Sequence, residues 1–134
     1  MFRLPAVRQA ESHVKNGGKA YMYYWVQPSA MPYRGACHAV ELAYVFQNPE
    51  QTIFTGEPAD AGLTEKVGDM WANFARFGDP SIPELDWLPY TEEDRMTAVI
   101  SLSPYMKNDP LKAQREQLSP ILRYMINASY AALD

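Results

Sequence analysis

The segment Ala20–Val26 (AYMYYWV) constrains the fold more than any other stretch of this sequence. It runs through seven consecutive apolar or aromatic residues and contains no charge. Both faces of such a strand are apolar, with Met22 and Tyr24 on one and Tyr21, Tyr23 and Trp25 on the other. Strands of this kind belong to sheets that helices cover on both sides, so the segment predicts an α/β fold. It is far too short to cross a membrane as a helix.

Two helical patterns flank this strand along the chain. The first starts near Pro5 and ends at Asn16-Gly17-Gly18, where the residue types tolerate a left-handed backbone. The second and stronger one ends at Gly78 and Pro80. Its apolar stripe consists of Leu63, Val67, Met70, Trp71, Phe74 and Ala75. Gly68 lies inside this helix at a cost of about 1 kcal/mol relative to Ala, which indicates a close approach of another segment.

The remaining patterns predict a short helix from His38 to Phe46, a second strand from Met96 to Leu102 and a helical tail. Asp109-Pro110 and Ser119-Pro120 are typical helix starts, so the tail is either two helices or one helix kinked at Pro120. Its expected buried residues are Leu118, Ile121, Leu122, Met125 and Ile126. A sheet of only two strands, packed with four or five helices, is marginally stable. This indicates that the strands are a piece of a larger sheet.

Length and composition set further limits. A chain of 134 residues supports a single domain with a hydrophobic core. Its net charge of -4 gives no electrostatic reason to bind nucleic acid or an anionic membrane. The single cysteine excludes an intrachain disulfide framework and a cysteine-rich zinc module. Because no apolar segment of a secretory signal follows Met1, we expect a cytoplasmic chain.

The two histidines are the first candidates for chemistry. His13 lies on the polar side of the first predicted helix, beside Glu11, and we interpret it as a surface residue. His38 follows a loop marked by Pro32 and Gly35, at the carboxyl side of the buried strand. Ligands and catalytic groups gather at this end of α/β strands. From position alone, a structural and a functional His38 are equally supported.

Three sequence blocks resemble the type-B carboxylesterases, the family that includes cholinesterases and para-nitrobenzyl esterases. Residues 35–46 (GACHAVELAYVF) resemble the catalytic-histidine segment of that family. Residues 70–80 (MWANFARFGDP) are similar to its Trp-x-x-Phe-x-x-x-Gly-(Asp/Asn)-Pro stretch, and Trp87-Leu88-Pro89-Tyr90 to its Trp-Pro-x-Tyr turn. The aromatic strand matches the one before the histidine loop. Two departures, Ala43 for a common Pro and Gln47 for a common Gly, leave the path of the next loop open.

The resemblance implies an α/β hydrolase that cleaves carboxylic esters with a Ser, an acid and a His, in that order along the chain. His38 is then the catalytic histidine. None of the seven serines has the two flanking glycines of a Gly-x-Ser-x-Gly elbow. An oxyanion loop needs a glycine run, and the one Gly-Gly pair in the sequence, Gly17-Gly18, is better explained as a helix cap. The acid of the family lies upstream of the aromatic strand, outside these residues. The chain by itself is therefore predicted to be inactive.

Three alternatives concern the neighbours of His38. Glu41 lies one helical turn later and is expected to support His38 through neighbours or water rather than act as the triad acid. A metal site of His38 and Glu41 needs further ligands, and His13 would have to come from a distant helix, so no metal or cofactor is expected. Cys37 is interpreted as a small core residue, not as a thiol nucleophile. The aromatic residues of the stronger helix, Trp71, Phe74 and Phe77, are expected to pack in the core.

Residues 1–134 are thus expected to form a single partial domain: the C-terminal part of an α/β hydrolase, with two strands and four or five helices. The expected function is carboxylic ester hydrolysis on a small ester in the complete enzyme. The alternative is a non-enzymatic remnant or interaction module that pairs through an exposed sheet edge. The expected partners are the missing N-terminal part of the esterase or a second copy of the chain.

Overall fold

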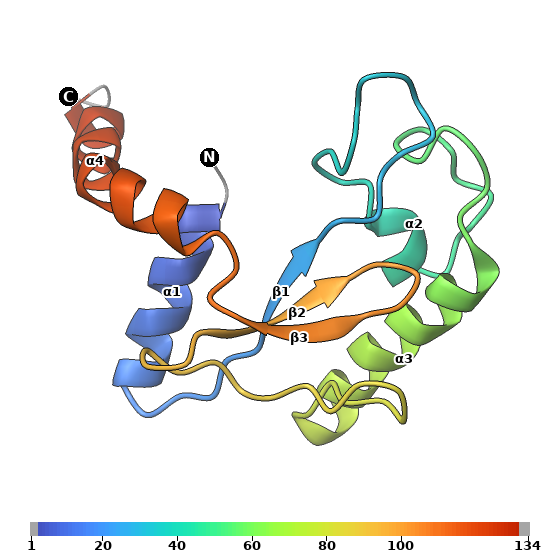
Figure 1. Cartoon of the computed structure of the whole chain (residues 1–134), viewed down its shortest axis with the longest axis horizontal. Coiled ribbons are helices and arrows are strands. Elements are labelled where there is room, and N and C mark those ends of the chain that lie inside the picture. Colours follow the sequence, from blue (N-terminus) through green and yellow to red (C-terminus); the bar gives the residue numbers. More distant parts are fainter. Residues whose placement is uncertain (1–2, 132–134) are drawn as a thin grey trace.

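In the computed structural model, which describes the backbone of residues 3–131 and the side chains of residues 3–121, helices lie on both sides of a small mixed sheet (Figure 1). The strands are β1 (Met22–Trp25), β2 (Met96–Ile100) and β3 (Tyr105–Asn108). The helices are α1 (Arg3–Lys15), α2 (Leu42–Val45), α3 (Ala61–Phe77) and α4 (Lys112–Ala131). None of the described helices is both long enough and apolar enough to span a bilayer.

The sheet has the order β1-β2-β3. β1 pairs with β2 in parallel, with Met22 opposite Thr97 and Trp25 opposite Ile100. β2 pairs with β3 in the antiparallel direction. β1 is therefore an edge strand of this sheet, and one of its sides carries no strand partner among the described residues.

The two faces of β1 are covered as its sequence predicts. On one face, Met22 is buried with Val7 of α1 and Tyr90. On the other face, Trp25 belongs to the main core, whose buried members from α3 are Leu63, Val67 and Met70. Figure 1 shows α1 and α3 on opposite sides of the sheet. The prediction of a strand that helices cover on both faces is confirmed, although its two middle residues, Tyr23 and Tyr24, are only half-buried.

The ends of α1 and α3 follow from their sequences. Gly17, just past α1, has a φ of 83°, and Gly78, the residue that caps α3, has a φ of 69°. At the start of α3, the Asp60 carboxylate accepts a hydrogen bond from the Leu63 N–H at 2.8 Å. The close approach expected at Gly68 is also present, because the side chain of Gln47 occupies the space that a Cβ would fill.

The prediction of two strands was wrong, because β3 forms a third. Its residues are mostly exposed, and Lys107 and Asn108 give it no apolar alternation. Such an edge strand is held by backbone hydrogen bonds to β2 rather than by burial, so its sequence carries little signal.

The tail forms one helix with Pro120 inside it, so of the two expected arrangements the separate helices are wrong. Leu118 and Ile121 are about half exposed, contrary to the prediction that they are buried. The other three predicted buried residues, Leu122, Met125 and Ile126, lie outside the residues whose side chains are described. Asp109 does not cap α4. Its carboxylate pairs with Arg115 one turn into the helix.

Candidate functional site

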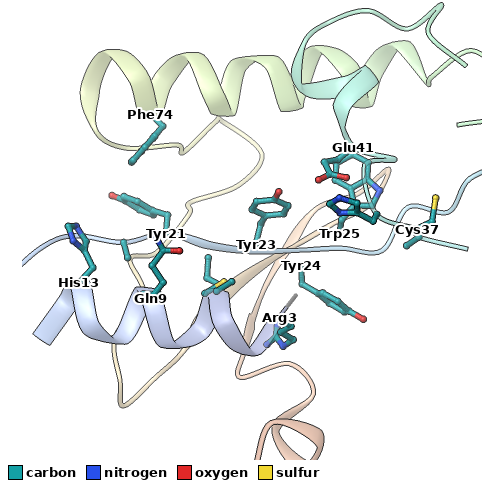
Figure 2. A pocket seen from close by; sticks show the side chains of 16 residues that line it. Arg3, Gln9, His13, Tyr21, Tyr23, Tyr24, Trp25, Cys37, Glu41 and Phe74 are labelled. Carbon is teal, nitrogen blue, oxygen red and sulfur yellow. The ribbon is translucent and has the colours of Figure 1, made fainter. Parts of the chain in front are cut away.

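A groove of about 860 Å³ runs along β1 (Figure 2). The strand forms its floor, α1 forms one wall, and the loop after β1 closes one end. Phe74 of α3 lies at the other side of the strand. The side chains that give the groove its polar character are Arg3, Gln9, His13, His38 and Glu41.

His38 lies where the sequence predicts it, on the loop that follows the carboxyl end of β1. Its side chain is exposed and lines the groove. The loop is fixed at its base, because the Ser29 N–H donates to the Gly35 carbonyl at 2.9 Å and the Ser29 hydroxyl to the Thr55 carbonyl at 3.1 Å. An exposed imidazole on a loop that these hydrogen bonds hold in place can exchange protons with a molecule in the groove.

His13 also lines the groove, but at its far end. Figure 2 shows His13 beside Tyr21, where β1 begins, whereas Glu41 lies beside Trp25, where β1 ends, and Cys37 lies beyond it. His13 is exposed, as expected for a surface residue of α1. The ring packs against Gly18, where a Cβ would overlap it.

Glu41 is half-buried and hydrogen-bonded to the hydroxyl of Tyr23 in β1. Burial, together with this carboxylate, raises the pKa of the Tyr23 phenol above its ordinary value of 10.0. The phenol therefore stays protonated and donates to the carboxylate. The contact joins the segment after His38 to the strand before it, which sequence reasoning did not anticipate.

The alternatives of a thiol nucleophile and a metal site gain no support. Cys37 is half-buried and packs against the main core, as expected for a small core residue. Among the residues that the structure describes, no three His, Cys, Asp or Glu side chains lie close enough together to hold a metal ion.

An aromatic layer lies between β1 and α3. Tyr23 packs edge-on against Trp71 with ring centroids 5.3 Å apart, and Tyr21 packs against Phe74 at 5.8 Å. Trp71 is half-buried, in line with its expected place in the core. Phe74 and Phe77 are not in the core, since they are 49% and 75% exposed. The two phenylalanines lie on the last two turns of α3.

The sequence pattern of the carboxylesterase family matches residues 1–118. This chain belongs to the carboxylesterase family. All three blocks that suggested the resemblance, together with His38, lie within the matched residues.

The chain is 39% identical to the bile salt-activated lipase of Bos taurus over 105 residues, 70% of the chain and 17% of the relative. It is 33% identical to the para-nitrobenzyl esterase of Bacillus subtilis over 104 residues, 75% of the chain and 21% of the relative. A solved carboxylesterase of Geobacillus stearothermophilus superposes with a TM-score of 0.67 at 29% identity, over 82% of this chain and 24% of that one. The chain thus spans about a fifth of the length of these relatives.

Proposed function

We propose that this chain forms the C-terminal part of an α/β-hydrolase domain that hydrolyses carboxylic esters, and that His38 is its catalytic base. The observation that supports the role of His38 is its position in the groove, on a hydrogen-bonded loop at the carboxyl end of β1. Open α/β sheets bind their ligands at this end of the strands.

In this proposal, His38 takes the proton from a serine hydroxyl as that oxygen attacks the ester carbonyl. It then gives the proton to the leaving alcohol. Neither the serine nor the acid is among these 134 residues. The free edge of β1 offers room for a neighbouring strand. A strand parallel to β1 ends at the same edge of the sheet, so a carboxylate that follows it would lie beside His38.

Glu41 has a supporting role in this proposal. Its carboxylate already accepts a hydrogen bond from Tyr23, so it ties the segment after His38 to β1. This contact favours a role in holding the loop over that of the triad acid, which orients the histidine directly.

The chain alone is expected to be inactive, because His38 has neither a nucleophile to activate nor an oxyanion hole to help it. The purified chain should hydrolyse p-nitrophenyl acetate no faster than its His38→Ala variant or free imidazole at equal concentration. Saturable turnover that disappears in His38→Ala would contradict this expectation.

A chimera tests the role of His38 directly. The matching C-terminal segment of the Bacillus subtilis para-nitrobenzyl esterase is replaced by this chain, and kcat is measured on p-nitrophenyl acetate. His38→Ala should lower kcat by roughly 10³-fold or more, since loss of a triad histidine removes the general base. His13→Ala, at the other end of the groove, is the matched control and should leave kcat within about twofold of the chimera. Equal losses in the two variants, or none in His38→Ala, would refute the proposal.

The free edge of β1 supports a second candidate function, an interaction module that binds another polypeptide strand. The β1 strand contains no charged residue, whereas the outer strand at the opposite edge of the sheet carries Lys107. Charged side chains protect sheet edges from pairing, so β1 is the edge that is open to pairing with another strand. This partner is either the upstream part of an esterase or a second copy of the chain.

For the isolated chain we propose a symmetric dimer through β1. Tyr23→Lys should weaken the dimer or cause aggregation, while Tyr105→Lys on the already charged β3 edge should leave it intact. Sedimentation velocity at high micromolar concentration measures both effects. A monodisperse, folded monomer of the unmodified chain would contradict the dimer.

A further inference from the structure

The chain reverses direction immediately after His38. The Val40 N–H donates to the Cys37 carbonyl at 3.3 Å and closes a four-residue turn, with His38 and Ala39 at its centre. Ala39 has a φ of 71°, whereas His38 is outside the left-handed region. This sequence of backbone angles is typical of a type II turn. We call residues 37–40 the His38 turn.

Ala39 occupies the position of a type II turn that favours glycine or asparagine, because a Cβ is strained at positive φ. Strain of this kind persists only where the surroundings fix the chain on both sides. After the turn, Val40 is fully buried in the main core. Before it, the Cys37 N–H donates to the Gly35 carbonyl at 3.0 Å, and Gly35 is tied to Ser29.

The reversal separates His38 from the core. His38 is exposed and lines the groove, whereas Ala39 and Val40 are 7% and 0% exposed. If Ala39 took a negative φ, the turn would open, and either Val40 would leave the core or His38 would move away from the groove.

We propose that the left-handed backbone of Ala39 sets the direction of the His38 side chain, which makes Ala39 a positioning residue for this histidine. Its importance for catalysis rests on the proposed function, but the orientation of His38 in the folded chain does not. Nothing in the sequence signals this role, because the His38 turn contains neither Gly nor Asn.

Four variants separate backbone conformation from packing. Ala39→Val cannot hold a positive φ, because its side chain is branched at Cβ, whereas Ala39→Gly holds it without strain. Ala43→Val and Ala43→Gly are the matched controls. Ala43 is equally buried at 6% exposure, but it lies in α2 outside the left-handed region.

The readout is NMR of the histidine ring signals in the folded chain at one fixed pH. The chain has two histidines, so His13 serves as an internal reference. Ala39→Val should displace the ring signals of His38, since the signals of an imidazole respond to small changes of its environment. Ala39→Gly and Ala43→Val should leave the His38 ring signals near those of the unmodified chain, and the His13 signals should not change in any variant.

Three results would overturn the proposal: unchanged His38 signals in Ala39→Val, equal displacement in Ala43→Val, or equal displacement in Ala39→Gly. If Ala39→Val does not fold, the melting temperatures of Ala39→Gly and Ala43→Gly test the proposal instead. Each loses one buried methyl group, but glycine relieves strain only at position 39, so Ala39→Gly should melt several degrees above Ala43→Gly. Equal melting temperatures would overturn the proposal. None of these experiments measures ester hydrolysis. Failure of the proposal for Ala39 is therefore distinguishable from failure of the proposed function in the chimera.

Discussion

The ion pair between Asp109 and Arg115 should hold the N-terminal end of α4 to the rest of the molecule. The variant Asp109→Ala tests this expectation. Arg115 Nε lies 3.1 Å from Asp109 Oδ1, and Arg115 Nη2 lies 2.7 Å from Oδ2. The two side chains are 7% and 15% exposed, with Asp109 the more buried. Arg3 of α1 lies close by and donates to the Pro110 carbonyl at 2.6 Å. Removing the carboxylate therefore leaves cationic groups at a site with little water.

Magnitudes for such pairs follow from burial. Removing one partner of a buried ion pair costs about 3–5 kcal/mol, because the other charge stays desolvated. An exposed pair contributes about 0–1 kcal/mol. The small exposure of Arg115 lets water screen part of the loss, so we expect Asp109→Ala to lower the free energy of unfolding by about 2–3 kcal/mol. For a domain of this size, that corresponds to a Tm lower by about 6–15 °C.

The loss should depend on pH. Burial alone would raise the pKa of Asp109, but the hydrogen bond and charge of Arg115, with Arg95 and Arg3, lower it overall below 3.8. A carboxyl whose folded-state pKa is lowered contributes its stability fully above the unfolded-state pKa. It loses that contribution as the pH falls through the folded-state pKa. The difference between the unmodified chain and Asp109→Ala should thus be constant near neutral pH and shrink below about pH 4.

Urea denaturation at neutral and acidic pH measures the free energy of unfolding. Lys112→Ala is the control, because its ammonium lies 3.9 Å from Glu116 on the same helix but is 66% exposed. It should change the free energy of unfolding by less than about 0.5 kcal/mol. A loss below about 1 kcal/mol in Asp109→Ala at neutral pH, or a difference that does not shrink in acid, would refute the reasoning.

Two further predictions concern α3. Met70→Ala should lower the free energy of unfolding by about 2–5 kcal/mol, because Met70 is fully buried, whereas Phe77→Ala at 75% exposure should change it by less than about 0.5 kcal/mol. Similar losses in a thermal or urea melt would mean that the two residues are not packed as described. Gly78→Ala should cost about 1–2 kcal/mol, since Gly78 has a φ of 69° with open space around it, so the cost is that of the backbone alone. Gly62→Ala, in the first turn of the same helix outside the left-handed region, should be neutral or stabilising, and a loss equal to that of Gly78→Ala would contradict this account.

The sequence by itself was sufficient for the elements whose stability depends on burial. The run of aromatic residues in β1 and the stripe of Leu63, Val67 and Met70 in α3 are periodic patterns, and such patterns report which face a helix or strand must hide from water. The block around His38 was informative for a different reason. Its resemblance to the carboxylesterases identified the family and the candidate base without any knowledge of the fold.

Tertiary structure decided the features that depend on segments distant in sequence. β3 exists because β2 offers it backbone partners, and not because its own residues favour a strand. The exposure of Leu118 depends on which other segments pack against α4, and the local sequence does not encode those contacts. Ala39 takes a left-handed backbone because Val40 is fixed in the core on one side and the loop is tied to Ser29 and Thr55 on the other. The direction of His38 thus depends on contacts that form only when the whole domain is folded.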